Sequence, residues 1–138
     1  MLTGVDVRKF SVGEDEGVEA FATVGLGAVT WAADANGKWA AYQPGTINCV
    51  TFIPAPLTDA ALVNLVSTVT EAKVQALLEC HVPGTGTASD AIVVCAAAGL
   101  ATDASQWYGG PRSFWGARVA RAARKAVLDG VRAQWGLP

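Results

Sequence analysis

Charged residues are scarce in this chain of 138 residues, since Lys, Arg, Asp and Glu together make up only 16% of it, against about 25% in an average soluble domain. The 10 basic and 12 acidic residues leave a net charge of −2. Without a basic excess the chain lacks the electrostatic footprint of a general nucleic-acid or membrane-surface binder. Few charges together with five tryptophans predict a homo-oligomer, because aromatic side chains are enriched at subunit interfaces.

Metal-ligand patterns and long hydrophobic runs are also missing. One histidine and three cysteines without a CxxC pair offer no zinc-type ligand set, so we expect no metal. No run of about 18 apolar residues is present, which predicts no membrane span. The first ten residues lack the apolar core of a signal peptide. We therefore expect a cytoplasmic protein with free thiols and no membrane partner.

Apolar periodicity predicts a single α+β domain over residues 1–138, with four strands and two long helices. The predicted strands cover residues 4–12, 18–26, 46–53 and 91–97, and the predicted helices cover residues 58–79 and about 113–135. The order is about β-β-β-α-β-α, a mixed sheet with both helices packed on it. The strand–helix–strand succession at its centre is a βαβ unit, whose two strands should be parallel.

Local patterns give finer expectations. Thr58 is suited to cap the first helix, and Val63 and Val66 are among its apolar residues at core spacing. The continuous apolar run at 91–97 is typical of a strand buried on both faces. Six of the ten basic residues lie between residues 112 and 132. They form a solvated helix face, pair with acidic residues from the start of the chain, or form a cradle for an anionic ligand.

Two polar turns precede the two strands of the βαβ unit. The second turn holds Thr85, Gly86, Thr87, Ser89 and Asp90. Hydroxyls and a carboxylate thus stand beside a glycine that lets a ligand approach the backbone closely. No Gly-Lys-Ser/Thr end is present, so this is not a Walker A loop. It is either a ligand-binding turn or a polar turn in which Asp90 caps the backbone.

The first turn carries Thr46 and Asn48. An asparagine in an apolar strand must satisfy several hydrogen bonds, so Asn48 either fastens a neighbouring loop or holds a ligand amide. Glu71 and Lys73 lie on the first helix, where Glu71 either has a functional role or pairs with Gln75. We expect the site where the turns at 44–48 and 85–90 meet, at the edge of the βαβ unit.

A family resemblance is carried by residues 44–77, PGTINCVTFIPAPLTDAALVNLVSTVTEAKVQAL, and by residues 85–90, TGTASD. Both resemble the adenosylcobinamide amidohydrolase family. That family typically shows Pro-Gly-Thr-Ile-Asn, Ala-Pro-Leu-Thr, a helix with Thr-Glu-Ala-Lys, and a Thr-Gly-Thr-Gly-Thr-Asp loop ahead of an apolar strand. Residues 2–8 and 23–26 are also similar, so the resemblance spans nearly the whole chain.

Two departures accompany the resemblance. Family members usually carry a further segment ahead of the part that begins this chain, so we expect the chain to correspond to their C-terminal portion. The family's Gly-Thr-His before the last helix reads Gly110-Pro111-Arg112 here. An imidazole can act as a base near neutral pH, whereas the always-charged guanidinium of Arg112 cannot.

The resemblance implies an enzyme that hydrolyses the aminopropanol amide of adenosylcobinamide in corrinoid salvage, a small-molecule substrate, and no cofactor. Two alternatives stay open. One is a diverged enzyme that carries out cyclisation or acyl transfer on a smaller anionic substrate gripped by Arg112. The other is a non-catalytic binding or structural protein.

The implied chemistry needs a proton acceptor and donors for a tetrahedral oxyanion. Asp90 and Glu71 are the candidates for the base, and burial would suit a carboxylate to that role by raising its pKa. The candidates for ligand binding are Thr46, Asn48, Thr85, Gly86, Thr87, Ser89, Lys73 and Arg112.

Overall fold

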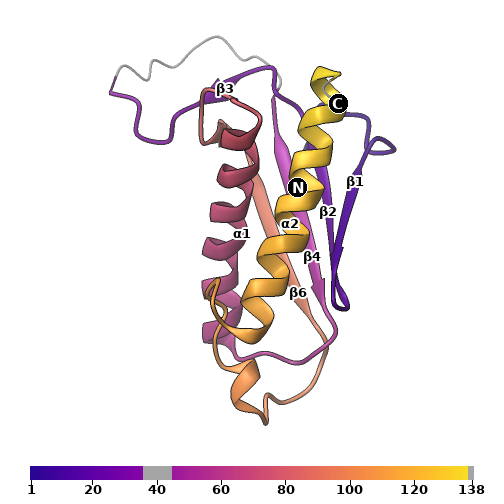
Figure 1. Cartoon of the computed structure of the whole chain (residues 1–138), viewed down its shortest axis with the longest axis vertical. Coiled ribbons are helices and arrows are strands. Elements are labelled where there is room, and N and C mark those ends of the chain that lie inside the picture. Colours follow the sequence, from indigo (N-terminus) through magenta and orange to yellow (C-terminus); the bar gives the residue numbers. More distant parts are fainter. Residues whose placement is uncertain (36–44, 137–138) are drawn as a thin grey trace.

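Four strands form one mixed sheet in the order β1-β2-β4-β6 (Figure 1). They are β1 (Ser11–Asp15), β2 (Val18–Val24), β4 (Ile47–Ile53) and β6 (Ala91–Ala96). The structure is a computed structural model that describes residues 1–35 and 45–136. β2 is antiparallel to both β1 and β4, while β6 is parallel to β4. The predicted mixed sheet and its parallel βαβ strands are thereby confirmed.

Two long helices cover one face of this sheet, as Figure 1 shows. They are α1 (Asp59–Glu79) and α2 (Phe114–Trp135), with a short 3₁₀ helix η1 (Ala104–Gln106) before α2. Thr58 caps α1 as predicted, because its hydroxyl accepts from the Ala61 amide at 3.2 Å. A two-stranded sheet of β3 (Val29–Thr30) and β5 (Gly86–Thr87) was not predicted, since two residues give no periodicity. No helix in the described part of the chain is long and apolar enough to cross a membrane.

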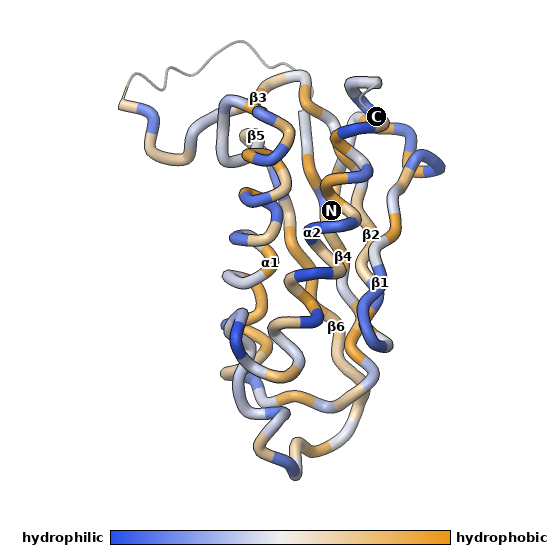
Figure 2. Tube along the Cα trace, in the orientation of Figure 1, coloured by the Kyte–Doolittle hydropathy of each residue, from blue (hydrophilic) through white to orange (hydrophobic). Residues whose placement is uncertain are grey.

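The core lies between the helices and the sheet, where Figure 2 shows hydrophobic segments facing one another. The alternating residues Val18, Ala20, Ala22 and Val24 of β2 are all buried, as the sequence predicts. From α2 the core receives Val119, Ala122, Ala123, Ala126 and Val127, each fully buried. These small side chains let the helix approach the sheet closely.

The opposite face of the sheet carries no helix among the described elements. Phe52 of β4 is 45% exposed and Phe10 is 51% exposed. Both rings pack against Phe21 of β2, with centroids 5.9 and 5.8 Å away respectively. The molecule thus has two layers, with one apolar sheet face open to solvent.

Three local expectations are wrong. The first strand covers residues 11–15 rather than 4–12. β6 is an edge strand of intermediate burial rather than a strand buried on both faces, because the sheet ends there. Val63 and Val66 are 72% and 42% exposed, while Leu65 and Val69 face the core instead.

The basic residues of α2 are mostly ion-paired, which favours the ion-paired interpretation over a cradle for an anionic ligand. Arg118 pairs with Glu16, and Arg121 with Asp15, both in the β1–β2 hairpin. Arg124 bonds Glu79 at the end of α1 and lowers the pKa of that carboxyl. These ion pairs hold α2 to the β1–β2 hairpin and to α1, against which it packs.

Candidate functional site

The two polar turns meet at the edge of the sheet where β4 and β6 begin. The Thr46 and Ser89 hydroxyl oxygens lie 2.7 Å apart. Thr87 Oγ1 lies 2.8 Å from the Gly45 carbonyl oxygen, and the Ile47 amide donates to Asp90 Oδ1 at 2.9 Å. Because β4 and β6 are parallel, the residues that precede them share one edge. The structure therefore places the turns together where the sequence analysis expects the site.

These residues form a polar cluster of Gly45, Thr46, Ile47, Thr87, Ser89 and Asp90, which Lys73 of α1 joins. Asp90 and Lys73 form a largely buried ion pair at its centre. Lys73 Nζ lies 2.5 Å from Asp90 Oδ2, and their side chains are 8% and 12% exposed. Asp90 also accepts from the Thr87 amide at 3.1 Å and from the Thr87 hydroxyl at 2.5 Å. With the Ile47 amide, each carboxylate oxygen has two donors. The roughly four acceptor positions of an ionised carboxylate are thus filled.

Gly86 makes room for this ion pair. A Cβ atom at Gly86 would lie 2.2 Å from Asp90 Oδ2 and 2.6 Å from Lys73 Nζ. Any side chain would therefore push the carboxylate and the ammonium apart. The glycine in the 85–90 turn thus leaves the space between β5 and α1 that the ion pair occupies.

The hydroxyl groups of the cluster can exchange partners. Thr87 has one hydroxyl hydrogen, and both Asp90 Oδ1 and the Gly45 carbonyl lie within reach of it. Ser89 Oγ lies 3.2 Å from the same Gly45 carbonyl and also contacts Thr46. If the Thr46 hydroxyl donates to Ser89, the Thr46 oxygen can accept a hydrogen bond from a ligand. If Ser89 donates to Thr46 instead, the Thr46 hydroxyl hydrogen is free to bond a ligand.

A polar pocket of about 310 Å³ adjoins the cluster at Gly45 and Thr46. Four glycines line this pocket, so much of its wall is backbone. Four polar residues line it as well. These residues are Gly4, Gly25, Gly27 and Gly45, with Asp6, Lys9, Thr46 and Gln134. The Gly25 amide donates to the Thr46 carbonyl at 2.9 Å, which fastens the wall to the cluster. Thr46 therefore belongs both to the pocket lining and to the polar cluster, through its contact with Ser89.

Four of the predicted site residues lie outside the cluster. Thr85 accepts from the Ala32 amide at 2.9 Å and so holds the segment that follows β3. Asn48 lies on the sheet face that carries no helix, where it is buried beneath the N-terminal segment and donates to the Leu2 carbonyl at 3.0 Å. Arg112 is exposed and comes just before α2, and α2 begins at the end of the molecule opposite β3 (Figure 1).

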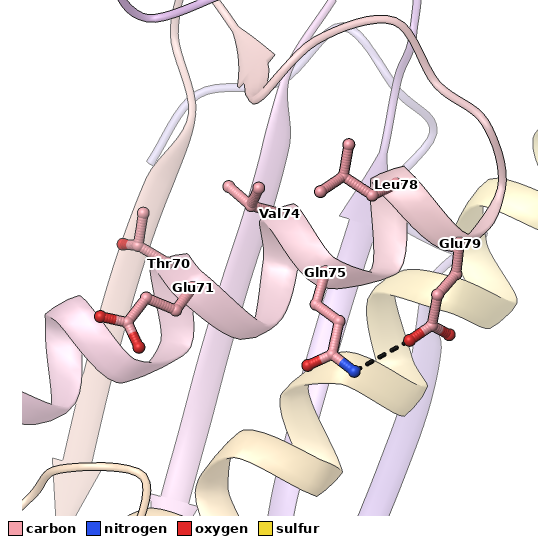
Figure 3. Close-up of a pocket in the computed structure, with 6 residues that line it drawn as sticks. All are labelled: Thr70, Glu71, Val74, Gln75, Leu78 and Glu79. Atoms are coloured by element: carbon pink, nitrogen blue, oxygen red, sulfur yellow. Dashed lines mark hydrogen bonds between the residues drawn. The ribbon is translucent and has the colours of Figure 1, made fainter.

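Glu71 is the fourth, and it lies in a hollow of about 550 Å³ on the outer surface of α1. Figure 3 shows it beside Thr70, Val74, Gln75, Leu78 and Glu79. Gln75 bonds Glu79 at 2.9 Å rather than Glu71. Glu71 and Lys73 are two residues apart on a helix, so they point to roughly opposite sides. Although this hollow is larger than the glycine-lined pocket, it is apolar and shallow, and we place the site at the cluster.

The glycine-lined pocket was not predicted from the sequence. Pro44 of the first turn lies outside the described residues. A signal for the pocket was present in Gly25-Leu26-Gly27, which interrupts the pattern of β2. Within the described ranges no group of three or more His, Cys, Asp or Glu side chains is arranged to hold a metal.

Cys49 lies near Lys73 on the helix-covered face of β4 and is a poor nucleophile. Burial raises the pKa of its thiol to about 12, although the positive charge of Lys73 acts in the opposite direction. The thiolate is the reactive form of cysteine. At neutral pH the Cys49 thiol therefore stays protonated, and the chemistry of the cluster rests on oxygen and nitrogen atoms.

Comparisons with known proteins agree with the resemblance. The model of the adenosylcobinamide amidohydrolase family matches residues 1–138. An adenosylcobinamide amidohydrolase of Methanosarcina mazei is 31% identical over 137 residues, covering 95% of this chain and 64% of the relative. An uncharacterized protein of Methanocaldococcus jannaschii is 32% identical over 93 residues, covering 62% and 35% respectively. The chain thus spans less than two thirds of the length of these curated relatives. No solved structure matches it significantly.

Proposed function

Because the chain belongs to the adenosylcobinamide amidohydrolase family, we propose that it hydrolyses the amide that holds the aminopropanol arm of adenosylcobinamide. A water oxygen bonds to the amide carbon, the C–N bond breaks, and the leaving nitrogen takes a proton. The products are a corrinoid carboxylic acid and a free amino alcohol. The observation that carries this proposal is that both turns with family-like motifs meet in one polar cluster beside a pocket.

In this proposal the scissile amide binds in the glycine-lined pocket next to Thr46. The Thr46 hydroxyl, supported by Ser89 at 2.7 Å, donates to the amide oxygen as negative charge develops there. Such a donor stabilises the transition state more than the ground state.

Of the two carboxylates predicted as a base, we favour Asp90 over Glu71, because only Asp90 belongs to the cluster. Its acceptor positions are filled in the resting arrangement, so it must release one donor before it takes a proton. Thr87 provides that release, since its hydroxyl can turn to the Gly45 carbonyl 2.8 Å away. Lys73 stays beside Asp90 and holds it in place.

The alternatives have no observation of this kind in their favour. A smaller anionic substrate gripped by Arg112 would sit outside the cluster, because Arg112 lies toward the other end of the molecule. Most basic residues of α2 are engaged in ion pairs rather than arranged as an anion cradle.

The experiment that tests this function is turnover of adenosylcobinamide by the purified chain, followed by chromatographic separation of the acid product. We expect turnover by the wild type and a loss of at least about tenfold in kcat/KM for Thr46→Val, equivalent to about 1.4 kcal/mol. Glu71→Gln is the control and should stay within about twofold of the wild type. Binding of the corrinoid without any hydrolysis would favour the non-catalytic alternative, and an active Thr46→Val would remove Thr46 from the reaction.

A further inference from the structure

The two edges of the sheet differ in how they are protected. An edge strand exposes a row of unpaired N–H and C=O groups, and proteins usually guard such edges with charged residues. β1 carries Glu14 and Asp15, and Asp15 is paired with Arg121 of α2. β6 has the sequence AIVVCA, without a charge. Val93 at its middle is 37% exposed.

The helix above this unguarded edge carries an apolar stripe on its outer side. The stripe consists of Val63, Val66, Thr70, Val74 and Leu78, spaced three or four residues apart. Val63, Val66 and Leu78 are 72%, 42% and 51% exposed. Figure 3 shows Thr70, Val74 and Leu78 pointing away from α2. Because α2 occupies the other side of α1, the stripe and the free edge of β6 lie on the same side of the molecule.

This side of the molecule is large enough for a stable contact. α1 is about 30 Å long, and one helix layer on one sheet layer is about 20 Å deep. The side therefore offers roughly 600 Å² per chain, close to the lower end of standard protein interfaces.

We propose that two copies of this chain associate through β6 across a two-fold axis. The two β6 strands run antiparallel, which joins the two four-stranded sheets into one, and the stripe of each α1 packs against its counterpart. A second copy fits this side because it offers the same unpaired backbone row and the same apolar stripe. An extended peptide would pair with β6 and leave the α1 stripe uncovered. This inference does not rest on the proposed function.

The test is the molar mass of the full chain, measured by sedimentation velocity, with two disrupting variants and a matched control. Val93→Lys places a charge at the middle of the β6 edge, and Val66→Glu places one in the stripe. Val12→Lys is the control, since it puts the same side chain on the opposite edge strand and the same sheet face. We expect a wild-type dimer at about 10 μM. The dissociation constant should rise at least about tenfold in both disrupting variants, while Val12→Lys keeps the wild-type value.

A wild type that is monomeric at about 100 μM would overturn the proposal. A dimer that resists both disrupting variants, or one that Val12→Lys dissociates equally, would also overturn it. Circular dichroism shows whether a variant is folded. If a disrupting variant fails to fold, hydrogen exchange of the wild type decides, because every second β6 amide points to the free edge. Those amides should exchange more slowly as protein concentration rises, and exchange independent of concentration would contradict the interface.

Discussion

Lys73 is the charged residue that the described part of the fold buries most completely, with 6% of its surface exposed. Taking an ammonium and a carboxylate out of water is costly, and the pair is tolerated because Asp90 also receives three other donors. Removal of one partner should therefore cost more stability than replacement of both, because it leaves the other charge buried and unpaired.

We expect Lys73→Met to lower the free energy of unfolding by about 3–5 kcal/mol, because it leaves the Asp90 carboxylate buried without its cation. The double variant Lys73→Met/Asp90→Asn should be clearly more stable than the sum of the single losses, since no unpaired charge remains. Urea unfolding of the four proteins measures this coupling. Lys125→Met, in the exposed Lys125–Asp129 pair, is the control and should cost less than about 1 kcal/mol. Additive losses would show that Lys73 and Asp90 are not coupled.

Cys49 makes stability depend on pH in the alkaline range. The ordinary pKa of its thiol is 9.0, and burial raises it to about 12. Between these values the unfolded thiol loses its proton while the folded one keeps it. The folded state then binds more protons, so the free energy of unfolding falls as pH rises above 9.0, by about 1.4 kcal/mol per pH unit from this group.

The measurement compares urea unfolding of the wild type and Cys49→Ala at several pH values above neutrality. Alanine loses some packing at every pH, so the comparison concerns the slope and not the absolute stability. The difference between the two proteins should shrink as pH rises. Parallel curves would mean that the Cys49 thiol has the same pKa in both states.

Among the structural elements, α2 and β1 approach each other so closely at Gly13 that no side chain would fit there. A Cβ atom at Gly13 would lie 2.0 Å from the Ala122 carbonyl oxygen and 2.8 Å from the Ala126 amide nitrogen. Both are backbone atoms of the helix, so the contact can be relieved only if α2 moves.

We therefore expect Gly13→Ala to lower the free energy of unfolding by about 1–3 kcal/mol or more, the range typical of overpacking. Thermal or urea unfolding measures the loss. Gly110→Ala is the matched control, because its Cβ would meet only the Asn64 side-chain oxygen at 3.3 Å. If the two variants lose the same stability, the close approach of α2 to β1 is wrong.

The elements also show where sequence patterns stop being informative. α1 could be bounded from Thr58 to Glu79, because a cap and a helix-ending Pro83-Gly84 flank it. Its buried side could not be chosen, since apolar residues lie on more than one side: Leu65 and Val69 face the core, while Val63 and Val66 face outward. In β6 the absence of polar residues predicts burial on both faces, although the strand lies at the edge of the sheet.

For the molecule as a whole, the order of strands and helices was predictable because turn and cap residues separate the long elements, while β2 alternates and α2 has apolar residues at helical spacing. The meeting of the two turns followed from the parallel pairing of β4 and β6. Lys73, Thr87 and Asp90 were singled out as separate candidates, but the ion pair between Lys73 and Asp90 depends on how α1 rotates over the sheet, which no local pattern encodes. Gly25-Leu26-Gly27 marks one part of the glycine-lined pocket, but the rest of its wall depends on contacts among residues far apart in the chain, which no local pattern encodes.

The position of α2 over the first hairpin has a consequence for synthesis of the chain. The buried residues of β2 are made before the helix that covers them, and Figure 1 shows the yellow helix lying against the indigo strands. A ribosome-bound chain therefore keeps Val18, Ala20, Ala22 and Val24 without their cover until α2 has emerged. The complete core can form only after α2 has emerged, and until then the growing chain is a natural client for chaperones that shield apolar strands.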